Sequence, residues 1–187
     1  MNTEYEIRVL EINKEEIIKK LESLNAQFIG EWFQKRYVYD FNPKIATKWI
    51  RLRTNGKETT LTIKDITSDK IDGTKELEIV VDDFDKTAKI LEELGYKPKA
   101  IQENKRIRYM YDNIEIDIDS WPLIPDYLEI EGNSVEDVEK TIHILELDGE
   151  KVTTKDCQSI YKDYGYNLDS IQELKLEEER KWNYMMI

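Results

Sequence analysis

Six short segments of this chain place charged residues at every second position, with apolar residues between them. The segments cover residues 4–8, 50–53, 76–79, 106–108, 115–119 and 127–131. Successive side chains of a β-strand point to opposite faces, so each segment predicts a strand with one charged and one apolar face. The charges are sorted by strand, because some strands carry pairs of acids and others carry pairs of arginines. A closed sheet with a charged interior requires such sorting, whereas a water-exposed sheet face does not.

Eight strands and four or five helices are predicted along the chain. The strands cover residues 3–11, 35–41, 47–54, 58–64, 74–81, 103–111, 114–120 and 127–131. Helical periodicity follows N-cap candidates at Asn13, at Asp83 or Asp85, and at Ser134, and it returns beyond Thr154. Eight antiparallel strands can close on themselves and remove their edges, and helices can then cover the apolar exterior. We therefore predict an α+β fold: a closed eight-stranded antiparallel β-barrel with a charged lumen, covered outside by helices.

The chain is expected to form a single domain over residues 1–187. Its length and its apolar fraction of 40% suit one domain with a substantial core, and no linker rich in Pro, Gly or Ser divides it. The barrel core is predicted at about residues 3–132, and the C-terminal helices at about residues 134–182.

Charge and cysteine content restrict the partners and the compartment. The 28 basic and 40 acidic residues give a net charge of −12, which repels nucleic acids and anionic membranes. A small anion held in a local cationic pocket is still compatible with that field. Cys157 is the only cysteine, so no intrachain disulfide can form, and neither a signal-like nor a membrane-spanning apolar run is present. We expect a cytoplasmic protein that binds neither nucleic acid nor membrane.

The charged faces of the predicted strands would meet in the barrel lumen. Six cations are expected there: Arg8, Arg51, Arg53, Lys64, Arg106 and Arg108. Up to nine carboxylates are expected with them: Glu4, Glu6, Glu76, Glu78, Glu115, Asp117, Asp119, Glu129 and Glu131. Arginine forks bind phosphate oxygens in pairs, and clusters of carboxylate oxygens suit Mg²⁺ or Mn²⁺. A metal-bridged triphosphate is a ligand class that needs both.

The segment Glu4-x-Glu6-x-Arg8 resembles the ExExK signature of the CYTH superfamily, also called triphosphate tunnel metalloenzymes. Further elements follow in that family's order: Arg51-x-Arg53, Lys64, Glu76-x-Glu78, Arg106-x-Arg108, Asp117 and Glu129-x-Glu131. The resemblance covers about residues 4 to 131. It implies an eight-stranded antiparallel tunnel, with class IV adenylyl cyclases, thiamine triphosphatases and inorganic triphosphatases as relatives. The chain departs from the signature at Arg8, which keeps the charge of the lysine but cannot act as a neutral amine.

With this resemblance, roles can be assigned to the lumen residues as predictions. Phosphate binding is assigned to Arg8, Arg51, Arg53, Lys64, Arg106 and Arg108. Ligation of Mg²⁺ or Mn²⁺ is assigned to Glu4, Glu6, Asp117, Glu129 and Glu131. The catalytic centre is assigned to Glu4, Glu6, Arg8, Glu129 and Glu131. Glu76 and Glu78 are expected to support the site by ligating metal or orienting the arginines.

Three functions remain open on the sequence. A metal-dependent triphosphatase that uses a metal-activated water is favoured, because no residue indicates an adenine pocket. A class IV-type adenylyl cyclase, which converts ATP to cyclic AMP and pyrophosphate, is the first alternative. A polyphosphate- or nucleotide-binding module without turnover is the second, although the intact set of acids argues against it. The expected partner is a small-molecule triphosphate, and the sequence allows a homodimer.

Overall fold

A computed structural model of the protein describes residues 1–147, 149 and 151–177. Eight long strands are present: β1 (Asn2–Val9), β2 (Gln27–Asp40), β3 (Lys48–Thr54), β4 (Thr59–Ile66), β5 (Thr74–Val81), β6 (Ala100–Tyr111), β7 (Ile114–Ser120) and β8 (Tyr127–Gly132). The helices are α1 (Lys14–Ser23), α2 (Phe84–Glu93), α3 (Val135–Ile144), α4 (Cys157–Asp163) and the 3₁₀ turn η1 (Leu168–Ser170). Two short strands, β9 (Val152–Thr153) and β10 (Glu173–Leu174), complete the set.

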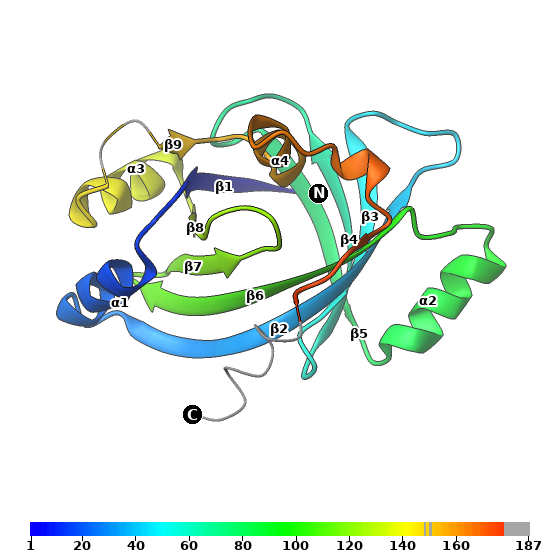
Figure 1. Ribbon diagram of the computed structural model, residues 1–187, viewed down its shortest axis with the longest axis horizontal. Helices are drawn as coiled ribbons and strands as arrows, with labels where there is room; N and C mark the ends of the chain where they lie inside the picture. The colour runs from blue at the N-terminus through cyan, green and yellow to red at the C-terminus, as the bar shows by residue number, and fades with distance from the viewer. Residues whose placement is uncertain (148, 150, 178–187) are drawn as a thin grey trace.

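The eight long strands close into one barrel. Neighbouring strands follow the order β6-β2-β3-β4-β5-β1-β8-β7, and β7 pairs again with β6. Each of these pairings is antiparallel. In Figure 1, β3, β4 and β5 lie together on the right, and β1, β2, β6, β7 and β8 form the rest of the barrel wall. The predicted closed, eight-stranded antiparallel barrel is therefore confirmed.

Helices lie outside the barrel, as the sequence predicts. α1 and α3 lie side by side at one end in Figure 1, and α2 lies at the other end. The largest apolar cluster joins α1 and α3 to the outer faces of β1, β6, β7 and β8, through residues such as Leu21, Val138 and Ile130. Asn13, Asp83 and Ser134 cap the first three helices, because each side chain accepts a hydrogen bond from a backbone N–H three residues later.

The second strand is longer than predicted. β2 begins at Gln27, because the segment before Gln34 pairs with β6 along its whole length, with one bulge between Phe28 and Gly30. This segment alternates weakly in its own sequence, and pairing with β6, which is distant in the sequence, determines its conformation.

The region after Thr154 contains a helix, as predicted, but the helical structure does not extend to Ile171 and Leu174, which were expected to pack from it. One helix, α4, is present, and Ile171 and Leu174 lie outside any helix. Leu174 is part of β10, which pairs in parallel with β6, and its side chain is buried against the cluster that includes Trp121 and Tyr161. Residues 178–182, which were also predicted to be helical, lie outside the described residues. Within the described part of the chain, no helix is long and apolar enough to cross a membrane.

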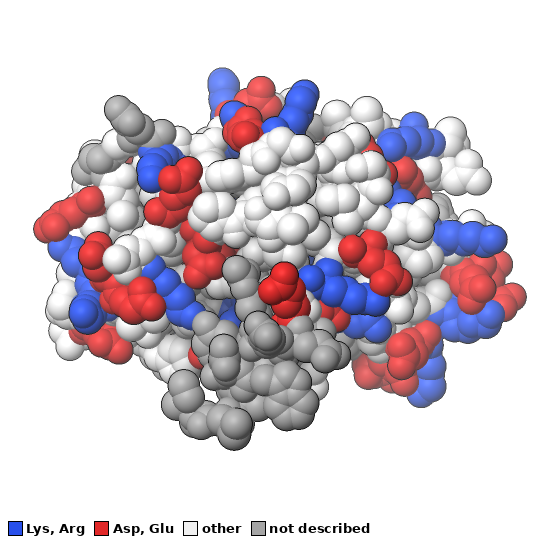
Figure 2. Space-filling view, in the orientation of Figure 1, with Lys and Arg blue, Asp and Glu red and all other residues white. Residues whose placement is uncertain are grey.

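Charge on the outer surface is mixed rather than sorted. Figure 2 shows acidic and basic side chains interspersed over the visible face of the molecule. The sorted pairs of acids and arginines instead point into the barrel, and Ile7, Ile116 and Ile130, which alternate with them, lie in the outer core. The alternation that predicted the strands therefore separates lumen from exterior.

Candidate active site in the barrel lumen

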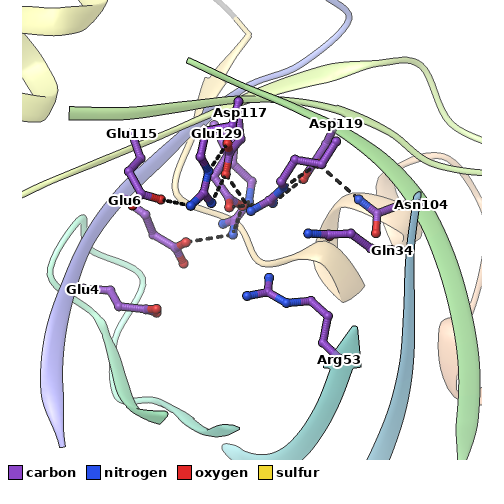
Figure 3. Close-up of polar contacts among 12 residues, drawn as sticks. Glu4, Glu6, Gln34, Arg53, Asn104, Glu115, Asp117, Asp119 and Glu129 are labelled. Atoms are coloured by element: carbon purple, nitrogen blue, oxygen red, sulfur yellow. Dashed lines mark hydrogen bonds and ion pairs between the residues drawn. The ribbon is translucent and has the colours of Figure 1, made fainter. Parts of the chain in front are cut away.

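The structure brings the predicted site residues together in the lumen. Ion pairs join residues from opposite parts of the chain, such as Lys64 with Glu4 and Arg8 with Glu129. Figure 3 shows Glu4 and Arg53 pointing toward one another from different walls, with Glu129 of β8 and Asp117 of β7 on a third side. Glu131 faces the same space, because Glu129, Lys64 and Glu6 all influence its ionisation.

Arg8 is held by acceptors of the protein on every side. Its Nε donates to Glu129 Oε2 at 2.9 Å, its Nη2 to Glu6 Oε2 at 3.0 Å, and its Nη1 to the carbonyl oxygen of Lys155 at 3.0 Å. Although burial alone would lower it, the pKa of Arg8 is raised well above its usual value by Glu6 and Glu129. Arg8 is therefore a permanently charged clamp between β1, β8 and the segment before α4. Its geometry favours fixing two glutamates over binding phosphate.

Arg106 and Arg108 are oriented by the acids of β7. The register places Arg106 opposite Asp119 and Arg108 opposite Asp117. Arg106 donates to Asp119 through Nε and Nη2 at 2.8 and 2.6 Å, and Arg108 donates to Asp117 through the same two atoms at 2.8 and 2.7 Å. Asp117 also lies 2.6 Å from Arg106 Nη1, so both of its oxygens contact arginines. The contacts of Asp117, which was predicted as a metal ligand, favour a role in orienting these arginines.

Glu76 and Glu78 contact the cations of β3 and β4. Lys64 Nζ lies 3.1 Å from Glu76 Oε2, and Arg51 Nη2 lies 3.4 and 3.2 Å from Glu76 Oε2 and Glu78 Oε2. Thr62 Oγ1 donates to Glu78 at 2.5 Å. These contacts agree with the predicted supporting role, in which carboxylates hold cations in place.

Glu4 and Glu131 carry carboxyl groups whose pKa values are raised. Burial raises the pKa of Glu4 to about 8, and the neighbouring Glu6 and Glu76 add to the rise, although Lys64 opposes it. Burial raises the pKa of Glu131 to about 7, and Glu129, Glu6 and Glu115 add to it. Within the described residues, Glu131 forms no ion pair or side-chain hydrogen bond of its own. Negative charge is therefore under-compensated at this wall of the lumen.

This donor set fits a divalent cation that shares its coordination with a substrate. The lumen acids offer only oxygen ligands, as Mg²⁺ and Mn²⁺ prefer. No three acidic, histidine or cysteine side chains of residues 1–147, 149 and 151–177 converge into a complete metal cage. Mg²⁺ commonly uses one or two carboxylates plus phosphate oxygens and water, so Glu4 and Glu131, with Glu6 beside them, are sufficient.

Two lumen residues of β2, Gln34 and Arg36, were not predicted from the sequence. Arg36 Nη2 donates to Gln34 Oε1 at 3.0 Å and also to Asn104 Oδ1. The sequence does contain a pattern that could have identified Arg36. Tyr37 and Tyr39 pack in an apolar cluster outside the barrel, so alternation places Arg36 on the inner face. Lys35 obscures this pattern, because two adjacent cations are also typical of a solvent-exposed turn or sheet edge.

Comparison with protein families gives one match over most of the chain. The model of the CYTH domain matches residues 2–160. A protein of Methanocaldococcus jannaschii that carries a provisional adenylate cyclase name is 28% identical over 149 residues, which are 76% of this chain and 83% of the relative.

Solved structures show the same barrel. The PH1012 protein of Pyrococcus horikoshii superposes with a TM-score of 0.71 at 25% identity, covering 82% of this chain and 96% of that protein. The Hippeastrum protein HpAC1 superposes with a TM-score of 0.62 at 14% identity, covering 87% and 96%. HpAC1 is provisionally named an adenylyl cyclase and is described as revealing a dominant triphosphatase activity. At 14% identity, this second likeness shows the fold alone.

Proposed function

The chain belongs to the CYTH domain family, and from this premise we propose that it is a divalent-metal-dependent hydrolase of a small-molecule triphosphate. One observation carries the proposal: the lumen has an acid wall, in which Glu131 has no ion pair among the described residues and Glu4 shares Lys64 with Glu76, and an arginine wall that includes the weakly paired Arg53. A single ligand that is both polyanionic and metal-bound satisfies both walls. A triphosphate with its cation is such a ligand.

The arginine wall supplies phosphate contacts. Arg53 lies 3.8 Å from its nearest described carboxylate oxygen, on Glu78, and burial with neighbouring Arg51 and Arg106 lowers its pKa well below the usual value. A guanidinium in that environment gains from an anion, because bidentate phosphate contacts are charge-assisted. Arg51 stands beside it, and Arg106 and Arg108 are held straight by the acids of β7. Preorganised cations of this kind stabilise charge that spreads over phosphate oxygens in the transition state.

The acid wall supplies metal ligation. Glu4 and Glu131, with Glu6 beside them, would hold the cation together with phosphate oxygens and water. When bound, the cation would neutralise phosphate charge and lower the pKa of a water molecule. Arg8 cannot accept the proton of that water, because it remains charged.

Hydrolysis is favoured over cyclisation because Trp121, the aromatic ring next to Arg36, is not available for stacking on a base. It is 2% exposed, and the guanidinium of Arg36 lies 4.5 Å from its centroid. Cyclisation needs a nucleoside held with its ribose folded back on the phosphates, whereas hydrolysis needs only the triphosphate and water. The cyclase stays the second candidate, since the M. jannaschii relative carries that name.

Product analysis tests the proposal. The protein is incubated with inorganic triphosphate, ATP or thiamine triphosphate, each with Mg²⁺, with Mn²⁺ or with excess chelator. Orthophosphate release that requires metal is expected from at least one substrate. Release of cyclic AMP and pyrophosphate from ATP would favour the cyclase, and the absence of any product would favour a binding module.

A further inference from the structure

Two arginines face each other across β2 and β3. The register places Arg36 directly opposite Arg53, and both side chains belong to the lumen face. Like charges directly opposite on antiparallel strands destabilise a sheet. Arg36 is only 7% exposed, so water screens this repulsion poorly. The pair therefore needs a compensating group.

The contacts of Arg36 supply no such charge. Its Nη2 donates to the neutral side chains of Gln34 and Asn104, and its guanidinium lies over the Trp121 ring. Its Nε is buried and forms no hydrogen bond within the described residues. No carboxylate of those residues lies within ion-pair distance of Arg36. This contrasts with Arg8 and Arg106, which each contact at least two carboxylates.

The surroundings of Arg36 add positive charge. The pKa of Arg36 is lowered to about 10, chiefly by burial. Nearby Arg51 and Arg106 also lower it, and each has a larger effect than Asp119, which raises it. A buried cation without an anionic partner destabilises the folded protein, and a bound anion would supply the missing negative charge.

The end of the lumen next to Arg36 is covered by an apolar cluster. Its buried members are Trp121, Ile124, Tyr127, Ile160, Tyr161, Leu168 and Leu174. Two of them belong to α4, whose Cys157 also lies close enough to Arg36 and Arg8 for charge interactions. Exposure rises along β6 away from this end: the side chains of Arg106, Arg108 and its partner Glu115 are 8%, 25% and 36% exposed. A chain-like anion would therefore enter from the side of these exposed residues.

We propose that Arg36 and Arg53 form a phosphate subsite that takes the terminal phosphate of a linear polyphosphate chain. This inference rests on the proposed function for its ligand class and adds the direction of binding. The apolar cluster behind Arg36 leaves a bulky organic group no place at this end. The substrate enters phosphate-first, and its organic part stays at the exposed side of the lumen. The protein consequently recognises the phosphate chain and is indifferent to the base of a nucleotide.

A binding measurement tests the subsite without turnover. Imidotriphosphate and adenylyl imidodiphosphate, which resist hydrolysis, are titrated by calorimetry in the presence of Mg²⁺. Arg36→Gln should weaken both ligands by the same factor, roughly tenfold to a hundredfold, as expected for losing a charge-assisted contact. Arg36→Lys should recover part of the loss, because it keeps the charge but not the fork.

Lys35→Gln is the matched control. Lys35 is adjacent on the same strand, carries the same charge, and faces outward, where its ammonium lies 5.0 Å from the ring of Tyr37. Its replacement should leave both affinities unchanged. The guanylyl counterpart of the adenine analogue should bind wild-type protein within about threefold of it. Strong preference for one base would overturn the phosphate-first orientation.

A stability measurement separates the subsite from a structural role. If Arg36 serves only as a prop for Trp121, Arg36→Gln lowers the melting temperature of ligand-free protein and leaves imidotriphosphate affinity unchanged, which would overturn the subsite. The subsite instead predicts an unchanged or higher melting temperature, because the repulsion from Arg53 is removed. Hydrolysis by wild type with unaltered binding by Arg36→Gln would refute the subsite alone. Binding lost in Arg36→Gln without any hydrolysis by wild type would refute the hydrolase proposal alone.

Discussion

Arg8 and Glu129 are register partners on β1 and β8, and their side chains meet at 2.9 Å between Nε and Oε2. Glu129 also accepts a hydrogen bond from Arg106 Nη2 at 3.0 Å, so one buried carboxylate joins two arginines of different strands. Arg8 and Arg106 hold the pKa of Glu129 well below its usual value, despite the opposing effect of burial. The lumen is therefore organised around ion pairs that are formed before any ligand binds.

Glu129→Gln should strongly destabilise the fold. The change leaves two buried guanidinium groups short of one neutralising charge, and breaking such a pair costs about 3–5 kcal/mol. Denaturant unfolding of the metal-free protein measures the loss. Glu11→Gln is the control, because it weakens only the exposed contacts of Glu11 with Lys151 and Tyr164 and should change stability little. Equal losses for both variants would contradict a preformed, buried network.

Metal-free protein should lose stability as pH rises from about 4.5 to about 8. Folded Glu4 and Glu131 keep their protons up to pKa values of about 8 and 7, whereas in the unfolded chain they release them near 4.5. The folded state thus binds more protons in this window, so raising the pH favours unfolding. Glu131→Gln should flatten the decline, and Glu139→Gln, at an exposed position of α3, should not. Urea unfolding at a series of pH values gives the slopes.

Mg²⁺ or Mn²⁺ should raise the melting temperature more at pH 8 than at pH 5. At the higher pH Glu131 is largely ionised and Glu4 partly so, both are repelled by Glu6, and a divalent cation relieves this repulsion. At pH 5 protonation of the carboxylates relieves the same repulsion, and protons compete with the metal for these groups. The Glu4→Gln, Glu131→Gln double variant should show little metal response at either pH. A wild-type melting curve indifferent to both metals at pH 8 would count against a cation in the lumen.

Arg53→Ala should weaken triphosphate more than diphosphate. Removal of a desolvated, charge-assisted phosphate contact costs about 1.5–3 kcal/mol, which corresponds to roughly tenfold to a hundredfold in affinity. The change should appear in KM for triphosphate, with a smaller effect for diphosphate, which occupies fewer subsites. Lys57→Ala, at the exposed β3–β4 hairpin, is the control for charge alone. Equal effects on both ligands would place Arg53 outside the phosphate-binding wall.

The barrel could be predicted from the sequence because its signal is local. Period-two alternation directly reports which residues share a strand face, so the lumen acids of β1, β7 and β8 and the arginines of β3 and β6 follow from spacing alone. The N-caps Asn13 and Ser134 are local signals as well. By contrast, β10 could not be predicted, because Leu174 is buried by pairing with β6 and by the Trp121 cluster, which are distant in sequence.

The division of labour within the lumen also could not be predicted. Spacing places Arg8, Arg53 and Asp117 inside, but it does not show which charges neutralise one another. In the structure, the contacts of Arg8 and Asp117 lie with other protein groups, whereas Arg53 stays largely uncompensated. The role of Arg36 could not be predicted, because it depends on the position of Arg36 opposite Arg53. The register between β2 and β3 does not follow from the sequence of either strand.

Hydrolysis of ATP in ¹⁸O-labelled water with Mg²⁺ tests the central claim most directly. If water attacks the terminal phosphorus, mass spectrometry should find one ¹⁸O atom in the released orthophosphate and none in ADP. The same label should enter orthophosphate from inorganic triphosphate, and excess chelator should abolish both reactions. Formation of cyclic AMP with unlabelled pyrophosphate would contradict the account, because the reacting phosphorus would then be the one next to the ribose.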